Sequence, residues 1–220
     1  MDETLGSQVL AQLRAQLITG MLAPGDKLSL RSLAQQLGVS MQPVRDAVAQ
    51  LVAERALEVT PKRSVQVPLM SLPQFRELTA IRLCVEGFAA EQAALQRGGG
   101  EVAALRRHEA SFRRESKRRA PDVDAAISAN ANLHFAVYRA TAMPALVAII
   151  EGLWLRIGPV LNLDLRDGEN RLRSGVAARC HADMLAAIGR GDAGAARAAL
   201  QEDIASTAAF IEARAVLPLE

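Results

Sequence analysis

Two histidines and two oxygen-bearing side chains in the second half of the chain have spacings that could bring them together on neighbouring helices. Asn130 precedes His134 by four residues, which places both side chains on one face of a helix. His181 is followed 22 residues later by Asp203. Two imidazoles, a carboxylate and an amide carbonyl form a donor set that suits zinc, manganese, nickel or iron. The residues alone leave a second interpretation open, in which both histidines are core residues hydrogen-bonded to Asn130 and Asp203.

A second group of side chains, in the first 70 residues, is of the kind that contacts DNA. Gln42 can form a bidentate pair with adenine, and Arg45 can do the same with guanine. The Ser40 hydroxyl and the N–H groups beside it suit a phosphate, and Lys62 and Arg63 could enter the minor groove or bind phosphate. The alternative is that these charged side chains are only solvated. The candidate DNA-contacting residues are Arg31, Ser40, Met41, Gln42, Arg45, Lys62 and Arg63.

The hydrophobic pattern of the first 70 residues predicts three helices followed by a short hairpin. Apolar residues recur at helical spacing over residues 1–22 and stop at Pro24. Ser29 can cap a second helix that Gly38 ends, and Ser40 can cap a third. Residues 57–68 have the pattern of two short strands around a basic turn. The arrangement predicts a winged helix-turn-helix, whose second helix lies in the major groove.

Two prolines within residues 68–73 separate this unit from a helical remainder, so we expect a domain boundary between residues 70 and 71. The remainder shows no strand pattern. We therefore predict a mainly α fold, with an N-terminal winged helix-turn-helix (1–70) and a C-terminal all-α helical bundle (71–220). A break is expected at Asp167–Gly168. The predicted helices of the second domain are residues 74–96, 101–119, 122–141, 143–164, 169–189 and 192–214.

Composition excludes several classes of protein. Of the 220 residues, 50% are hydrophobic and 23% charged, which excludes a disordered tail. Only 3% are aromatic, which argues against a platform that stacks single-stranded bases and against an all-β sandwich. A net charge of +2 is too small for a non-specific binder of chromatin type. Any contact with nucleic acid must therefore be local.

The cysteines and the start of the chain indicate a reducing compartment. Cys84 and Cys180 form no CxxC motif and are too few for a disulfide framework. The first residues lack the basic and apolar regions of a signal peptide, so we expect a cytoplasmic protein. Glu151 and Arg156 interrupt the most apolar stretch, residues 143–165. We interpret that stretch as a buried core helix and expect no membrane partner.

Residues 25–51 contain a series of short motifs: Gly25-Asp26-Lys27-Leu28, Leu33-Ala34, Leu37-Gly38-Val39-Ser40, Pro43-Val44-Arg45-Asp46-Ala47 and Leu51. Together they resemble the N-terminal domain of GntR-family bacterial transcription regulators. The resemblance implies double-stranded operator DNA as a partner. This chain departs from the family pattern at Met41, where arginine is usual, and at Arg55 and Ser64, where glycine is usual. The customary half-site is therefore not expected, and the wing backbone has lost a residue that lets it approach DNA closely.

The helical remainder resembles the FadR/VanR-type (FCD) effector domain, which implies that it binds an effector and forms a homodimer. Such domains commonly hold a divalent metal ion through Asp-x3-His, a later His and another His 22 residues on. Asn130, His134, His181 and Asp203 occupy these four positions. Asn replaces the first Asp, and Asp replaces the last His. The resemblance thus favours a metal site, with zinc, manganese, nickel or iron as the ion.

Arg82 resembles the arginine that faces the effector pocket in this family and can hold a carboxylate through its planar guanidinium. A salt bridge with Glu86, four residues on, is the alternative role. The effector-binding residues implied are Arg82, Asn130, His134 and His181. Tyr138, with Phe135 and Trp154, is expected to build core, and His108 to lie on a solvated face.

We predict a ligand-responsive, homodimeric DNA-binding regulator, a repressor, that senses a small organic acid through a metal-containing helical domain. The alternative is a metal-dependent enzyme that uses His134, His181 and Asp203 to hold an ion and activate water. A helical adaptor with a protein-binding winged domain is a third possibility. The sequence shows no catalytic base of the HExxH kind, and the winged unit would have no role in an enzyme. We therefore do not expect an enzyme.

Overall fold

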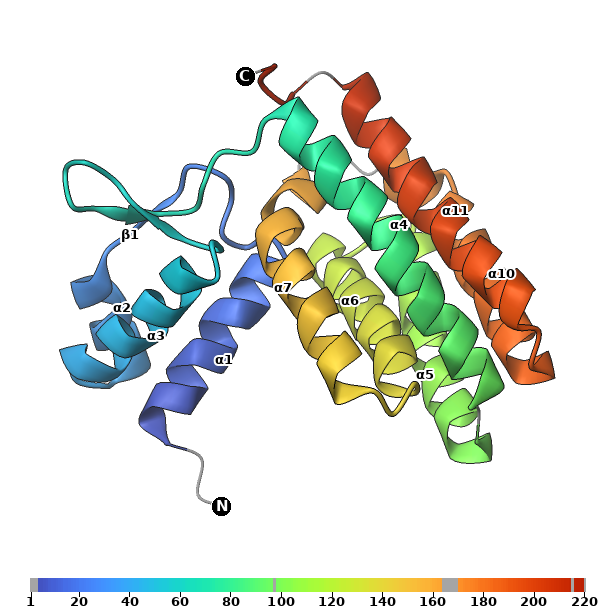
Figure 1. Cartoon of the computed structure of the whole chain (residues 1–220). Coiled ribbons are helices and arrows are strands. Elements are labelled where there is room, and N and C mark those ends of the chain that lie inside the picture. The colour runs from blue at the N-terminus through green and yellow to red at the C-terminus, as the bar shows by residue number, and fades with distance from the viewer. Residues whose placement is uncertain (1–3, 97, 164–169, 215, 220) are drawn as a thin grey trace. The chain divides into compact units, whose positions relative to one another are not determined.

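Helices dominate the computed structural model, which describes residues 4–96, 98–163, 170–214 and 216–219 (Figure 1). The break expected at Asp167–Gly168 lies outside these residues. The chain divides into two compact units. The first contains Met1–Met70 and Trp154–Val160, and the second contains Ser71–Leu153 and Leu161–Glu220.

The first unit begins with three helices, of which the second starts and ends at the caps that the sequence predicts. They are α1 (Leu5–Ile18), α2 (Leu30–Leu37) and α3 (Met41–Ala53). The Ser29 hydroxyl accepts a hydrogen bond from the Ser32 backbone N–H at 3.2 Å, and Gly38 ends α2 in the left-handed conformation with φ of 64°. Buried apolar residues of α1 and α3 contribute to one core. Among them are Val9, Leu13, Leu17, Val44, Val48 and Leu51.

A three-stranded antiparallel sheet completes this unit, in the order β1 (Lys27–Leu28), β3 (Val65–Gln66), β2 (Glu58–Val59). Gln66 pairs with Lys27 on one side and with Glu58 on the other. The sequence predicted the hairpin of β2 and β3 but not β1. β2 and β3 are just as short but flank one turn, which is a local signal, whereas β1 pairs with a strand far along the chain.

Arg55 follows the C-terminus of α3 in the left-handed conformation, with φ of 59°. An L-residue with a Cβ is strained there, whereas glycine is not. We expect Arg55→Gly to raise the free energy of unfolding by about 1 kcal/mol. Denaturant unfolding of the variant and the wild-type protein measures the difference.

Arg55→Ala is the matched control, because it removes the same charge and keeps the strained Cβ. It should not stabilise the protein. Equal stabilisation by alanine and glycine would attribute the gain to loss of the side chain and would contradict a backbone cause.

The second unit is a helical bundle in which α4 lies beside α11 and α10, and α5 lies beside α6 and α10 (Figure 1). α6 and α11 start at aspartate caps: the Asp122 carboxylate accepts from the Ala125 backbone N–H, and the Asp192 carboxylate from the Ala195 backbone N–H, each at 3.0 Å. The sequence predicted one helix over 169–189, but Gly175, with φ of 72°, separates α9 from α10. The helices are α4 (Leu72–Leu95), α5 (Gly99–Ser116), α6 (Val123–Arg139), α9 (Asn170–Arg173), α10 (Val176–Arg190), α11 (Ala193–Ala213) and α7 (Pro144–Leu161), of which residues 154–160 belong to the first unit.

Of the helices described, α7 alone is long and apolar enough to cross a membrane. Half of its residues are nevertheless buried within the protein, among them Ile150, Leu155 and Ile157. A helix whose apolar residues are enclosed in this way has the character of a core helix.

Candidate functional site

The N-terminus of α3 presents polar side chains outward. Ser40 caps the helix in an extended conformation, but its hydroxyl makes no capping hydrogen bond. Gln42 and Arg45 are exposed on the first turns. The Gln42 amide donates to the Asp46 carboxylate at 2.8 Å, so an adenine contact would have to replace that bond. Met41 is half-buried and packs against the core of the first unit, which leaves only part of its side chain for a base.

The remaining candidate DNA contacts lie on α2 and on the turn between β2 and β3. Arg31 is exposed in the first turn of α2. Lys62 and Arg63 are exposed on the turn, which closes through a 2.8 Å hydrogen bond from the Thr60 backbone N–H to the Ser64 carbonyl. Arg63 has φ of 60°, the left-handed conformation. The positive φ thus falls on Arg63, one residue before Ser64, where the sequence comparison placed the missing glycine.

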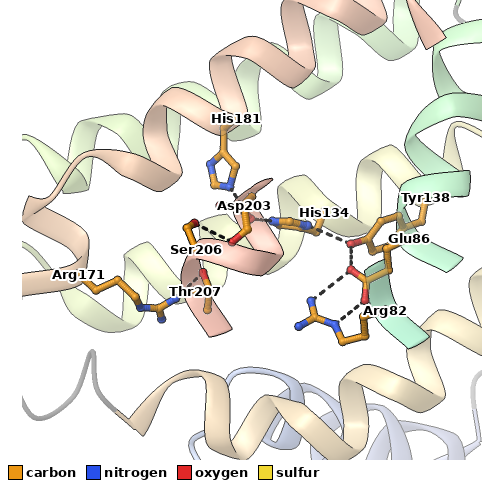
Figure 2. Close-up of polar contacts among 9 residues, drawn as sticks. All are labelled: Arg82, Glu86, His134, Tyr138, Arg171, His181, Asp203, Ser206 and Thr207. Atoms are coloured by element: carbon orange, nitrogen blue, oxygen red, sulfur yellow. Dashed lines mark hydrogen bonds and ion pairs between the residues drawn. The ribbon is translucent and has the colours of Figure 1, made fainter. Parts of the chain in front are cut away.

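A buried polar cluster lies within the second unit, on four helices (Figure 2). Two of its residues come from α4, two from α6 and one each from α10 and α11. Every member is at most 7% exposed. Six ionisable or polar side chains in one core require mutual pairing, because an unpaired buried charge is costly. The cluster consists of Arg82, Glu86, His134, Tyr138, His181 and Asp203.

His134, His181 and Asp203 form one end of this cluster. His134 Nε2 lies 3.1 Å from Asp203 Oδ2, and His181 Nε2 lies 3.7 Å from the same oxygen. Phe112 packs edge-on against the His181 imidazole, with 4.7 Å between ring centroids. Burial opposes ionisation of the Asp203 carboxyl, but the two adjacent imidazoles outweigh it and hold the pKa of that carboxyl well below its ordinary value.

Three polar atoms at this end have no hydrogen-bond partner among the described residues: both ring nitrogens of His181 and Oδ1 of Asp203. Buried polar atoms without a partner are rare in a protein core unless an ion or a water molecule binds them. One ligand atom from each of His134, His181 and Asp203 lies within 4.8 Å of the others. Ligands of one zinc ion lie no more than about 4.2 Å apart, so a small side-chain movement would close the site. Their chemistry and unsatisfied atoms fit a divalent metal ion.

Arg82, Glu86 and Tyr138 form the other end. Arg82 Nε and Nη2 donate to the two Glu86 oxygens at 2.5 and 3.2 Å. The Tyr138 hydroxyl donates to Glu86 Oε2 and lies 3.0 Å from His134 Nδ1. Burial and the adjacent Glu86 carboxylate raise the pKa of the Tyr138 phenol well above its ordinary value, so the phenol keeps its proton. Arg82 therefore makes the salt bridge that the sequence offered as the alternative to binding a ligand carboxylate.

The structure thus brings together three of the four residues proposed as metal ligands. Asn130, the fourth, is half-buried on α6, one turn before His134. Sequence reasoning assigned no hydrogen-bonding role to Tyr138, which was expected only to build core. Its position four residues after His134 was the available signal, because that spacing places both on one helix face.

Models of two families match the chain. The model described as "Bacterial regulatory proteins, gntR family" matches residues 5–67, and that of the FCD domain matches residues 77–206. The HTH-type transcriptional regulator McbR of Escherichia coli (strain K12) is 35% identical over 72% of this chain and 71% of its own length. The HTH-type transcriptional repressor RspR of the same strain is 30% identical over 42% of this chain and 40% of its own. The solved structure titled E. coli McbR/YncC has a TM-score of 0.88 at 30% identity, covering 96% of this chain and 99% of that one.

Proposed function

Because the chain belongs to the GntR family of bacterial DNA-binding transcription regulators and carries the FCD effector domain, we propose that it is a metal-dependent, ligand-responsive repressor. Members of this family regulate transcription and are not enzymes, so the metal-dependent enzyme is not a second candidate. Repression is supported by one relative whose name describes a transcriptional repressor.

The first unit binds operator DNA through α3 and the wing, which is the hairpin of β2 and β3 with the turn between them. Arg45 and Gln42 are exposed at the start of α3, where a recognition helix contacts base edges. Ser40 has a hydroxyl without a capping bond, which suits a phosphate. Arg31, Lys62 and Arg63 add charge that binds backbone phosphates. Met41 brings no guanidinium, so this half-site should lack a guanine preference at the base it faces.

The unsatisfied atoms of His181 and Asp203 are the observation that carries the sensing part of the proposal. His134, His181 and Asp203, with Asn130 beside them, would hold a divalent ion such as zinc, manganese, nickel or iron. When bound, the ion would supply positive charge and open coordination positions for an acidic ligand. Because Asn is neutral, we expect weaker metal binding than an Asp at this position would give.

The proposed effector is a small carboxylate. An anion entering the second unit would meet the ion and Arg82, the two positive charges of the cluster. Glu86 already holds Arg82 through two hydrogen bonds, so the ligand must compete with an internal carboxylate for the guanidinium. This competition favours ligands that also bind the ion, since one contact alone would not displace Glu86.

We propose that α4 forms a homodimer interface. Ile81, Phe88 and Leu95 are exposed large apolar residues seven positions apart, and Cys84 is exposed between the first two. Phe88→Asp should weaken dimerisation by about tenfold or more, because it places a charge in an apolar contact. Sedimentation equilibrium measures this.

Cross-linking provides a second readout. Burial raises the pKa of the Cys180 thiol to about 11, so that thiol should not react at neutral pH. A short bis-maleimide should therefore link two chains through Cys84 and should fail with Cys84→Ser. A dimer that is unchanged by Phe88→Asp and not linked through Cys84 would place the interface elsewhere.

Footprinting on DNA upstream of the protein's own gene tests the function as a whole. We expect protection of a short palindrome, because a symmetric dimer presents two recognition helices to two half-sites. Addition of zinc with a panel of small carboxylic acids should release or strengthen that protection. DNA binding that does not depend on the base sequence and responds to none of these additions would overturn the proposal.

A further inference from the structure

The Tyr138 hydroxyl connects the two ends of the buried polar cluster, and it has one proton to give. That proton goes to Glu86 Oε2. Glu86 is fully buried and also accepts two N–H bonds from Arg82, so it acts as an acceptor throughout. The hydroxyl oxygen is then left as the acceptor for its other neighbour, His134 Nδ1, at 3.0 Å. It follows that the His134 proton is on Nδ1.

A proton on Nδ1 decides what the other ring nitrogen can do. Neutral imidazole carries a single N–H, so Nε2 presents a lone pair. That lone pair faces Asp203 Oδ2 at 3.1 Å, with His181 Nε2 3.7 Å from the same oxygen. A positive charge must lie between these two atoms, either a second proton on the ring, which pairs with Asp203 when no ion is present, or the ion itself. The relay from Arg82 through Glu86 and Tyr138 thus prepares His134 to offer Nε2 to a cation.

We propose that Tyr138 is a positioning residue for the metal ligand His134, and that the Arg82–Glu86 ion pair holds Tyr138 in that role. This inference rests on the proposed metal site. It also explains why Glu86, a carboxylate in a core, keeps three hydrogen bonds. Hydrogen bonds of this kind behind a metal-binding histidine fix its ring orientation and tautomer, and their loss typically costs 10- to 100-fold in metal affinity.

The two ends of the relay are also linked in function. A ligand carboxylate that drew Arg82 away from Glu86 would break the hydrogen bonds between these two residues. Glu86, which orients the Tyr138 hydroxyl, would then lose its Arg82 partner. Occupancy of Arg82 would then alter the affinity of His134 for the ion, and by reciprocity the ion would alter the affinity for the acid.

Zinc affinity of the full-length protein, measured by competition with a chromophoric chelator, tests the proposal. Tyr138→Phe removes the hydroxyl and keeps the ring, and it should weaken zinc binding about 10- to 100-fold. Thr141→Val is the matched control. Thr141 is also fully buried near the end of α6, and its hydroxyl donates to the Tyr138 carbonyl and accepts from the Met143 backbone N–H. It should leave the zinc affinity within about threefold of wild type.

The outcomes are distinct. Zinc affinity of Tyr138→Phe equal to wild type, or equal losses in both variants, would overturn the positioning role and leave the metal site standing. A wild-type protein that binds no zinc would overturn both proposals.

A second measurement does not depend on the variant folding. In zinc-loaded wild-type protein with 15N-labelled histidine, NMR should show the His134 proton on Nδ1. A proton on Nε2, with the metal on Nδ1, would overturn the inference.

Discussion

His181→Ala should abolish the thermal stabilisation that zinc, manganese or nickel gives the wild-type protein. An ion that binds only the folded state contributes about 2.7 kcal/mol when its concentration is 100 times the dissociation constant. His181 is fully buried and supplies two of the three polar atoms that have no hydrogen-bond partner. Its removal takes a ligand from the site, and no neighbouring residue can replace it. Melting curves with and without each ion measure the change, and elemental analysis of the purified protein measures its metal content.

His108→Ala is the control, because His108 is the one histidine outside the cluster and lies half-buried on α5. It should retain the full metal-dependent shift. An equal shift in His181→Ala and wild type would show that the ions act elsewhere on the protein.

Arg45→Ala should weaken operator binding by about 1–3 kcal/mol and relax the base preference at one position of each half-site. Arg45 is exposed near the start of α3, and a guanidinium there can bind guanine O6 and N7 together. Fluorescence anisotropy with operator DNA and with random DNA of equal length measures the loss on each. A similar loss on both would mean that Arg45 contacts only phosphate.

Lys62→Ala is the comparison, because a wing lysine binds backbone phosphate without reading sequence. It should weaken binding to all sequences alike and lower the slope of affinity against salt by about one. A loss confined to the operator would instead make Lys62 a base-reading residue.

The sequence predicted the family and the mainly α fold, and both were confirmed by the domain matches. Local signals sufficed for the helix-turn-helix, since Ser29 and Gly38 mark the ends of α2 by their own chemistry. β1 was missed because it pairs with β3, far along the chain, and no turn next to it signals a strand. The single helix expected over 169–189 was wrong, because Gly175 adopts the left-handed conformation between α9 and α10, and a glycine within a helical pattern is compatible with either outcome.

Within the buried polar cluster, spacing predicted that His134, His181 and Asp203 could meet, because each lies on the inward face of its helix. It could not decide between the two roles of Arg82, because Glu86 at four residues' distance is compatible with both. The choice depends on burial, which only packing sets: Arg82 and Glu86 are both enclosed, and the pairing is then required. The direction of the Tyr138 hydroxyl proton is harder still to predict from sequence, since it depends on Glu86 and Arg82 of another helix, α4.

The affinity of the protein for its upstream operator, measured with and without bound ion and acid, tests most directly whether the second unit controls DNA binding. We predict that the ion together with an effective acid changes the dissociation constant of the wild-type protein by about 5- to 150-fold. In His181→Ala the same additions should change nothing, while the affinity of the metal-free variant should match that of the metal-free wild type. An operator affinity that does not respond in the wild type, or that responds equally in His181→Ala, would contradict the account.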